Sequence, residues 1–595
     1  MFAPGSVLLH DTLAPQGENL LFTAPQAVLQ AHDAAGVRAA LAQLEAARSQ
    51  GLWAAGYLAY EAGLAFEERL VHRLPPASDT PLLWLGLYAP PQRLSAAETG
   101  QLLAQAAGSA TGRARDIVPS LTPAQYAAAF DRVKALIAAG DTYQVNLTFQ
   151  ADFRLEGDPV ALYVDLVRQQ PVAYGALLNT GTHWILSRSP ELFVASRGTT
   201  LSARPMKGTL KRGRTIAEDA IGRAALASDE KNRAENLMIT DLLRNDLGRI
   251  AEIGSVKVTD LFTVETYRTL HTMTSGITAT RRPGVSTTAL LENLFPCGSI
   301  TGAPKLRAME IIDELETRPR GVYTGSIGYF APNGDLTLNV AIRTAVIDRD
   351  GRGSIGIGGG VVADSTAGDE YREALLKMAF FTDPADPVTL IETLLWTPAD
   401  GYSLLQRHLE RLAASAAYFA LPCDLAAITA LLKGQAFTAP MRVRLMLSAD
   451  GPQLTATPLP PNPERFRFMI AEERLDSQSL WLAHKTTNRA FYDAPRQRAH
   501  AAHGVDEVVF LNERGELTEG SITNLFVERA GLLLTPPLAS GLLPGTLRAE
   551  LLATGRAVEQ VLTLADLTSA EAVWLGNSVR GLLPAQWVQP SVQVE

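Results

Sequence analysis

Residues 140–153, GDTYQVNLTFQADF, carry the pattern that decides the fold class. Apolar side chains stand at every second position from Tyr143 to Phe149, and polar side chains stand between them from Gln144 to Gln150. This period of two predicts a β-strand with one apolar and one polar face. The polar face either is wet or lines a cleft, and the stretch alone leaves both readings open.

A helix is predicted just before this strand and a bend after it. Thr122, Pro123 and Gln125 give a capping-box start with proline at the first helical position, and Gly140 ends the helix. Further on, WILSRSPELFVAS (184–196) is a strand candidate interrupted at Ser187–Pro190, which sets Glu191 beside a bend. The sequence therefore mixes helices and strands.

The stretch SARPMKGTLKRG (202–213) follows directly and contains Lys207. Most lysines beside glycine and proline are solvated loop residues, so the stretch by itself favours a surface turn over a positioned nucleophile.

Residues 228–248, SDEKNRAENLMITDLLRNDLG, predict a helix with Ser228 as N-cap and Gly248 as stop. Glu235 lies on the side of its apolar stripe, which is a costly place for a charge unless it is paired or binds a metal. A further helix, 300–316, is entered through Gly302 and Pro304.

The strand SIGIGGGVVADS (354–365) ends in a glycine cluster. It lacks the full GxGxxG spacing of a dinucleotide loop, but Gly358–Gly360 let backbone N–H groups approach an anion closely. In the helix that follows, Glu370, Glu373 and Lys377 share one face. For an isolated helix, Glu373 and Lys377 would be a surface ion pair.

Composition and charge exclude several classes of protein. The net charge is −9, from 53 basic and 62 acidic residues, without long runs of like charge, which argues against nucleic acid or anionic membranes as partners. Cys297 and Cys423 are the two cysteines of the sequence, so a disulfide framework is excluded and a cytoplasmic setting is expected. The beginning, MFAPGSVLLHDTLAPQ, lacks the pattern of a secretory signal, and no apolar run is long enough for a membrane span.

At 595 residues the chain is expected to hold more than one domain. Residues 98–117 are small and polar and predict a surface connection, and FTDPADPVT (381–389) predicts a linker. Periodic signals then restart, with a helix at 407–419, a strand at 441–448 and strands joined by glycine turns at 507–536. The predicted domains are 1–382, divided into an N-terminal part (1–117) and a core (118–382), a linker at 383–389, and 390–595.

The first domain resembles the chorismate-utilising enzymes, and within them the aminodeoxychorismate synthases. The motifs that carry the resemblance, in order, are GDTYQVNL, SRSPELF, PMKGT, SDEKNRAENLMITDLLRNDLGR, ITGAPKLRAMEIIDELE, YTGSIGY, NVAIRTA and GGGVVADSTAGDEYREALLK. The resemblance implies an α+β fold with two stacked antiparallel sheets and outer helices.

The resemblance also implies roles for the residues noted above. Glu191 matches the general acid that protonates the departing hydroxyl group. His271 and Thr301 match polar groups that line the substrate ring. A Mg²⁺ ion would be held by Glu235 and Glu373, with Glu370 near it. The carboxylates of chorismate would be bound by Arg343, Tyr323, Gly358, Gly359, Gly360 and Lys377.

Two positions separate the relatives from one another. Anthranilate synthases have alanine where this chain has Lys207, whereas aminodeoxychorismate synthases use this lysine as a nucleophile. Isochorismate and salicylate synthases place a water-activating lysine where this chain has Gln144, so ammonia is the expected nucleophile here.

Residues 388–595 resemble the fold-type IV pyridoxal-phosphate enzymes, through HLERL, HKTTNR, ELTEGSITNLF and LLPGTLR. In this resemblance Lys485 would form the Schiff base with pyridoxal 5'-phosphate and move the C4 proton, and Glu519 would pair with the pyridine nitrogen. The phosphate would be held by Arg411, Ser521, Ile522, Thr523 and Thr546.

Together the resemblances imply amination of chorismate to 4-amino-4-deoxychorismate and then elimination of pyruvate to give 4-aminobenzoate, a folate precursor. The sequence shows no glutaminase nucleophile elbow, so glutamine-dependent activity is expected to need a separate amidotransferase chain. A homodimer through the second domain is compatible with this reading. Two alternatives stay open: an anthranilate-type synthase fused to a class IV aminotransferase, and one half serving as a non-catalytic regulatory module.

Overall fold

The computed structural model describes residues 2–14, 19–76, 80–267, 270–382 and 388–589. The chain divides into two compact units, Met1–Arg212 with Gly222–Pro384 and Gly213–Ile221 with Ala385–Glu595. Of the linker predicted at 383–389, residues 383–387 lie outside the described residues.

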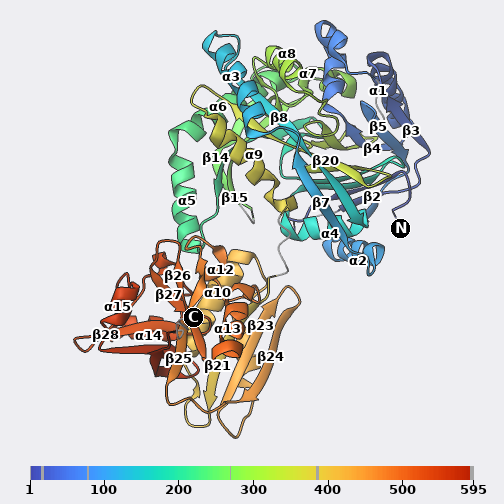
Figure 1. The fold of residues 1–595 in the computed structure, drawn as a ribbon. Coiled ribbons are helices and arrows are strands. Elements are labelled where there is room, and N and C mark those ends of the chain that lie inside the picture. The colour runs from blue at the N-terminus through green and yellow to red at the C-terminus, as the bar shows by residue number, and fades with distance from the viewer. Residues whose placement is uncertain (1, 15–18, 77–79, 268–269, 383–387, 590–595) are drawn as a thin grey trace. The chain divides into compact units, whose positions relative to one another are not determined.

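The first unit is built on two antiparallel sheets (Figure 1). One has the strand order β16-β8-β20-β19-β10-β9-β1-β2-β6, with β7 paired to β8. Its strands are β1 (Ser6–His10), β2 (Asn19–Phe22), β6 (Gln92–Leu94), β7 (Gly112–Pro119), β8 (Gln144–Gly157), β9 (Tyr174–Asn179), β10 (His183–Ser189), β16 (Gly302–Ala303), β19 (Thr344–Asp348) and β20 (Arg352–Val361).

The other sheet has the order β13-β15-β12-β11-β18-β17-β4-β5-β3, with β14 paired to β15. Its strands are β3 (Ala27–Ala31), β4 (Trp53–Leu58), β5 (Leu83–Tyr88), β11 (Leu192–Arg197), β12 (Thr200–Arg204), β13 (Met206–Lys211), β14 (Lys257–Thr266), β15 (Leu270–Thr280), β17 (Ser326–Phe330) and β18 (Leu336–Asn339). Val7 and Phe22 of the first sheet share a buried cluster with Tyr57 and Trp84 of the second, so the two sheets face one another.

Helices cover the outer faces of these sheets. For example, α6 packs on β13 and β15, α9 packs on β20, and α1 packs on β3. The helices that begin in residues 34–367 are α1 (Ala34–Ser49), α2 (Ala96–Ala107), α3 (Pro123–Ala138), α4 (Pro159–Gln169), α5 (Ile216–Ser228), α6 (Glu230–Gly248), α7 (Thr287–Leu294), α8 (Lys305–Leu315) and α9 (Ala367–Thr382). The predicted architecture of stacked antiparallel sheets with outer helices is confirmed.

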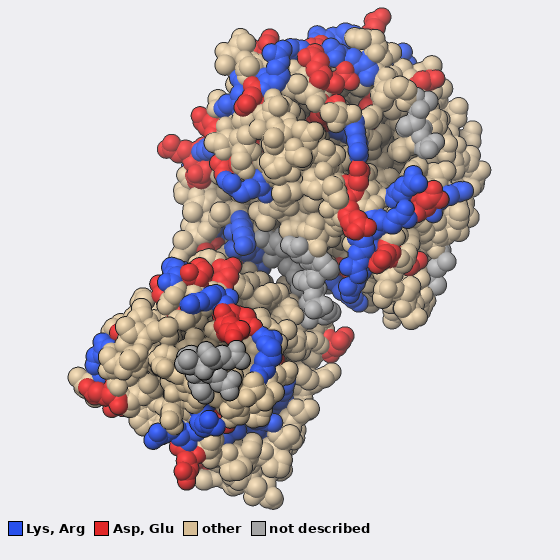
Figure 2. All heavy atoms as spheres, viewed as in Figure 1, with Lys and Arg blue, Asp and Glu red and all other residues tan. Residues whose placement is uncertain are grey.

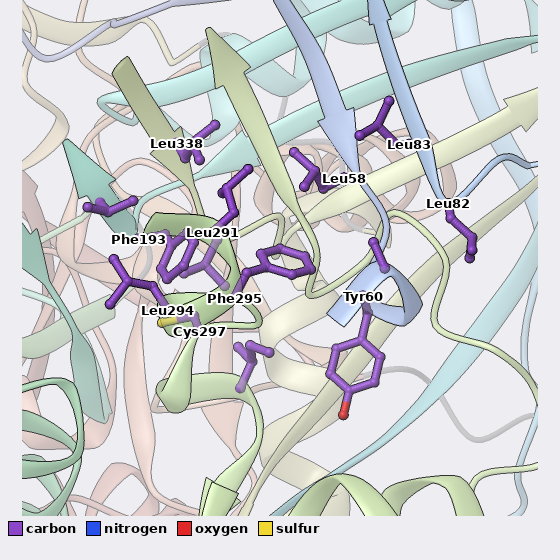
Figure 3. Packing of buried hydrophobic residues seen from close by; sticks show 14 of the residues in the cluster. Leu58, Tyr60, Leu82, Leu83, Phe193, Leu291, Leu294, Phe295, Cys297 and Leu338 are labelled. Atoms are coloured by element: carbon purple, nitrogen blue, oxygen red, sulfur yellow. The ribbon is translucent and has the colours of Figure 1, made fainter. Parts of the chain in front are cut away.

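A large cluster of buried hydrophobic side chains packs the segment that follows α7 against the second sheet. Phe295 lies with its ring centroid 6.0 Å from that of Phe193 on β11, and Leu291 and Cys297 lie beside them (Figure 3). This packing fixes the start of residues 297–301, which carry polar side chains toward the centre of the unit.

Local signals in the sequence were correct in some places and wrong in others. The capping box between Thr122 and Gln125 at the start of α3 is confirmed. The N-cap predicted at Ser228 is wrong, because Ser228 ends α5 with its hydroxyl on the carbonyls of Ala224 and Ala225. Asp229 caps α6 instead by accepting from the backbone N–H of Asn232.

The surface connection predicted at 98–117 is also wrong. A capping box between Ser95 and Glu98 starts α2, which takes in the first half of the stretch. The second half forms β7, whose backbone pairs with β8. Small polar residues do not prevent a strand where a long neighbouring strand offers unpaired backbone groups.

The structure settles the question left open about the polar face of residues 140–153. On β8, Gln144, Asn146 and Thr148 are buried, as are Val145 and Leu147 on the apolar face. The polar face is therefore enclosed and not wet.

The second unit contains a small and a larger sheet. The small sheet has the order β22-β21-β23-β24 and the larger one β27-β26-β25-β32-β31-β28-β29-β30, in which β25 runs parallel to β26 and β32. The strands are β21 (Leu390–Thr397), β22 (Gly401–Tyr402), β23 (Met441–Ser448), β24 (Gly451–Pro458), β25 (Phe466–Leu475), β26 (Glu507–Asn512), β27 (Leu517–Gly520), β28 (Asn524–Arg529), β29 (Leu532–Thr535), β30 (Ala557–Glu559), β31 (Ala572–Asn577) and β32 (Gly581–Trp587). The helices are α10 (Leu405–Phe419), α11 (Leu425–Lys433), α12 (Leu480–Ala483), α13 (Ala490–His503), α14 (Thr546–Ala553) and α15 (Leu564–Thr568).

Basic and acidic side chains are interspersed on the face of each unit that Figure 2 shows. Among the described helices, none is long and apolar enough to cross a membrane.

Candidate active sites

The first unit encloses a cavity of about 290 Å³ between strands of both sheets and helices α6 and α9. It brings together most of the residues singled out in the sequence for this unit. Those that line it are Glu191, Lys207, Glu235, Tyr323, Arg343, Gly358, Gly359, Gly360, Glu370, Glu373 and Lys377.

Lys207 reaches the cavity from β13 at an irregular point of the sheet. The pairing of β13 with β15 shifts register between Met206 and Thr209, and Gly208 has φ of +89°. A bulge of this kind re-aims side chains. The Lys207 Nζ lies 3.7 Å from Glu235 Oε2, and both side chains are 15% exposed. The stretch that favoured a surface turn is thus part of a cavity wall.

Because Gly360 has no side chain, the end of the Lys207 side chain fits beside it. A Cβ on Gly360 would lie 2.3 Å from the Lys207 Nζ and 3.1 Å from the side-chain amide of Gln144. Gln144 lies just behind the cavity wall, and in the described part of the chain its amide oxygen and nitrogen are buried without a hydrogen-bond partner.

Glu191 follows Pro190 at the break between β10 and β11 and is buried in the cavity wall. Burial raises the pKa of its carboxyl group to about 7, although the Ser299 hydroxyl opposes the rise by donating to Oε1 at 2.6 Å. A carboxyl group with such a pKa carries a proton at neutral pH about half of the time, so it can act as an acid.

Arg343 brings a guanidinium group to the cavity. The side chain is half-buried, its buried Nη1 has no hydrogen-bond partner among the described residues, and its backbone has φ of 52°. Burial lowers the pKa of the guanidinium to about 10, which leaves it charged at neutral pH. A half-buried guanidinium with an unpaired buried nitrogen is costly unless an anion joins it, so the geometry fits a carboxylate ligand.

The three other glutamates of the cavity contact polar or basic neighbours. Glu370 accepts from the Ser365 hydroxyl at 2.6 Å, and burial raises the pKa of Glu370. Glu373 pairs with Lys377 at 2.9 Å, and this lysine lowers the pKa of Glu373. Within the described residues, no group of three His, Cys, Asp or Glu side chains is already gathered as a metal site.

Of the residues expected in this cavity, Gln144, His271 and Thr301 do not line it. Thr272 of β15 lines the cavity. Because side chains alternate along a strand, the neighbouring His271 lies on the other face. There, His271 Nδ1 lies 3.0 Å from the Thr266 hydroxyl. The Thr301 hydroxyl donates hydrogen bonds to the backbone carbonyls of Cys297 and Gly298.

Sequence reasoning missed other residues of the wall. They include Asn146, Lys231, Asn232, Thr272 and Ser299. Asn146 could have been found, because it shares the polar face of β8 with Gln144. Ser299 could not, because only the fold brings residue 299 to residue 191.

The second unit encloses a cavity of about 570 Å³ between its two sheets. Its walls include every residue singled out in the sequence for this unit. They are Arg411, Lys485, Glu519, Ser521, Ile522, Thr523 and Thr546.

Glu519 is buried and Lys485 is half-buried at the cavity wall. Burial, followed by the charges of Arg411 and Arg489, lowers the pKa of Lys485 to about 8. Glu519 accepts from the Tyr492 hydroxyl at 2.5 Å and from the backbone N–H of Leu543 at 2.7 Å. A lysine with this pKa is neutral in an appreciable fraction at neutral pH and can attack a carbonyl carbon.

Other donors of this cavity already have anionic partners. Arg411 pairs with the buried Glu392. The Ser521–Thr523 turn is bound to the buried Glu507, which accepts from the Ser521 and Thr523 hydroxyls and the Ser521 and Ile522 N–H groups. This carboxylate thus occupies four donors of the turn and holds it next to Glu519.

Comparison with known proteins matches both halves of the chain to families. Residues 8–383 match the chorismate binding enzyme family, and residues 389–587 match amino-transferase class IV. Both resemblances noted in the sequence are thereby confirmed.

Curated relatives and a solved structure agree with the first match. The aminodeoxychorismate synthase of Streptomyces griseus is 48% identical over 244 residues, which are 41% of this chain and 34% of that protein. The aminodeoxychorismate synthase component 1 of Salmonella typhimurium is 43% identical over 269 residues, 45% of this chain and 59% of that protein. The chain thus spans between a third and three fifths of the length of these relatives.

The crystal structure of anthranilate synthase component I from Streptococcus pneumoniae TIGR4 is similar at a TM-score of 0.54 and 27% identity, covering 64% of this chain and 95% of that one. Since the first family match takes in more than half of the 595 residues, the chain belongs to the chorismate binding enzyme family, and an amino-transferase class IV domain follows within it.

Proposed function

We propose that the chain makes 4-aminobenzoate in two steps. The first unit aminates chorismate with ammonia to give 4-amino-4-deoxychorismate, and the second eliminates pyruvate from this product. The observation that carries the proposal is the meeting of Lys207, the buried acid Glu191 and the unpaired Arg343 in one cavity.

In the first step each of these residues has a separate role. Arg343 binds a carboxylate of chorismate, and Tyr323, Lys377 and the backbone at Gly358–Gly360 complete the wall around it. Glu191 gives its proton to the hydroxyl group that leaves the ring. The Lys207 Nζ adds to the ring as this hydroxyl departs, and ammonia then displaces it at C4.

Lys207 supports amination at C4 over the anthranilate-type alternative. A lysine in this wall can form a covalent bond to the ring, which alanine cannot. Gln144, behind Gly360, is an amide and cannot act as the base that activates water. Ammonia is thus the nucleophile that fits, and we propose that a separate glutamine amidotransferase chain supplies it, as the name component 1 of the Salmonella typhimurium relative suggests.

The donor set fits a magnesium ion in the first cavity. Glu235, Glu370 and Glu373 offer carboxylate oxygens, the ligands that Mg²⁺ prefers. Lys207 and Lys377 now contact two of these carboxylates and balance their charge. Such an ion would neutralise the ring carboxylate of chorismate and the glutamates together.

The second cavity fits pyridoxal 5'-phosphate, the cofactor that the class IV match implies. Lys485 would hold it and move the proton at C4, and Glu519 would face the pyridine nitrogen. Arg411 and Thr546 would hold the phosphate, while the Ser521–Thr523 turn, already bound to Glu507, would border the ring. When bound, this cofactor supplies an electron sink for the elimination of pyruvate.

The test is an assay of two variants with chorismate, Mg²⁺ and an ammonium salt. Lys207→Ala should make neither 4-amino-4-deoxychorismate nor 4-aminobenzoate. Lys485→Ala should accumulate 4-amino-4-deoxychorismate and release no pyruvate. Amination at wild-type rate by Lys207→Ala would overturn the first role, and undiminished 4-aminobenzoate formation by Lys485→Ala would overturn the second.

A further inference from the structure

The small sheet of the second unit turns two arginines toward its cavity. On β23, Val443 and Leu445 point into a buried cluster, so Arg442 and Arg444 lie on the opposite face, where both line the cavity and are exposed. Strand alternation thus places two guanidinium groups on one wall.

The remaining arginines of this cavity are already held by oxygen atoms of the protein. Arg411 is bound by Glu392 and Arg489 by Asp493, whereas Arg496 and Arg580 donate to the backbone carbonyls of Asp506 and Pro461. The side chains of Arg442 and Arg444, by contrast, have neither a hydrogen bond nor an ion pair to any part of the chain that the structure describes. Arg442 and Arg444 are therefore the arginines of this cavity that can bind an anion from solution.

The spacing of the pair and its surroundings fit a ligand with two acidic groups. Positions i and i+2 of a strand are about 7 Å apart. Thr457 and Thr455 of β24 lie opposite Arg442 and Arg444 and add hydroxyl donors on the same wall. Guanidinium groups bind carboxylates through two parallel hydrogen bonds, so each arginine can take one carboxylate.

We propose that Arg442 and Arg444 bind the two carboxylates of a dicarboxylate substrate in the second cavity and thereby select it over monocarboxylate amino acids. The inference rests on the proposed function, in which the second unit receives 4-amino-4-deoxychorismate, a dicarboxylate. An amino acid with a single carboxylate engages one of the two arginines and leaves the other unpaired. The pair therefore determines specificity, and Lys485 carries the chemistry.

The experiment uses the full chain loaded with pyridoxal phosphate, in a Lys207→Ala background that silences the first step. Chorismate is the probe of binding, because it carries both carboxylates and has a hydroxyl group in place of the reacting amine. Its dissociation constant is measured from the change in pyridoxal-phosphate absorbance, which does not report on the first cavity. Benzoate is the monocarboxylate probe, and turnover of supplied 4-amino-4-deoxychorismate is measured in parallel.

Arg442→Ala and Arg444→Ala should each weaken chorismate about 10- to 100-fold, as expected for loss of a charge-assisted pair, and benzoate less than about threefold. The KM for 4-amino-4-deoxychorismate should rise by a similar factor, with a smaller change in kcat. Lysine at either position should restore part of the affinity, because it keeps the charge and loses the two parallel bonds. Arg498→Ala is the matched control, because Arg498 lies on α13, pairs with Glu473 and does not line the cavity.

Equal weakening of chorismate and benzoate, or no weakening of either, overturns the inference. Failure of the proposed function itself looks different. The protein with both arginines intact would then make no 4-aminobenzoate from supplied 4-amino-4-deoxychorismate, whatever stands at positions 442 and 444.

Discussion

Replacing Glu191 by glutamine should abolish most amination and yet stabilise the protein at alkaline pH. Glutamine keeps the shape of the side chain but has no proton to give to the leaving hydroxyl group. Loss of a positioned general acid costs about 10²- to 10⁴-fold in rate. The amination rate, measured as 4-amino-4-deoxychorismate formed from chorismate and ammonium, should fall by this factor.

The stability effect follows from the raised pKa of Glu191. Burial moves this pKa from its ordinary value of 4.5 to about 7, which corresponds to ~3 kcal/mol. Because the folded pKa lies above the unfolded one, the native protein loses stability as the pH rises from about 4.5 through about 7. Glutamine does not titrate, so the free energy of unfolding of Glu191→Gln should exceed that of the wild type by a margin that grows to ~3 kcal/mol at pH 8.

The assay is denaturant unfolding of both proteins at pH 5 and pH 8, with the difference between the two proteins compared at each pH. Other buried acids such as Glu61 and Glu519 titrate in both proteins and cancel in this difference. The wild-type amination rate per concentration of neutral ammonia should also fall as the pH rises above about 7. A margin that shrinks toward pH 8, or a variant that keeps its amination activity, would contradict the role assigned to Glu191.

Three further changes test the first cavity. Ser299→Ala removes the hydroxyl that stabilises the ionised form of Glu191, so the alkaline limb of the amination pH profile should move to higher pH; an unmoved limb would argue against this contact. Gly360→Ala should lower amination about 100-fold or more with little loss of stability in a melting experiment, because its Cβ displaces the flexible end of Lys207, and an active variant would contradict that placement. Arg343→Lys should raise the KM for chorismate at least about tenfold, since lysine lacks the planar fork, and an unchanged KM would remove Arg343 from carboxylate binding.

Much of the first cavity was predictable because its residues lie in long ordered motifs. Lys207, Glu235 and Arg343 come from elements far apart in the chain, and the motif order alone implied that they meet. His271 shows where this fails, since a strand turns neighbouring side chains to opposite faces and its position in a motif does not say which face it takes.

Local sequence signals led to wrong predictions at the N-cap of α6 and in residues 98–117. Ser228 and Asp229 are both good N-caps, and because α5 continues through Ser228, the cap of α6 falls to Asp229. The composition of residues 98–117 is that of a loop, but the backbone of β8 pairs with its second half. Tertiary pairing overrides local preference in such stretches.

Contacts between distant segments were beyond the sequence. Glu507 lies fourteen residues before Ser521, and the hold of its carboxylate on the Ser521–Thr523 turn follows from the pairing of β26 with β27. The unpaired state of Arg442 and Arg444 likewise depends on what every other arginine of the cavity contacts. Local patterns cannot report it.

The proposed function is amination of chorismate at C4 followed by loss of pyruvate, both in one chain. It is tested by identifying the product that forms when purified protein loaded with pyridoxal phosphate receives chorismate, Mg²⁺ and an ammonium salt. We expect 4-aminobenzoate and pyruvate in equal amounts. Anthranilate as the product would contradict the proposed function.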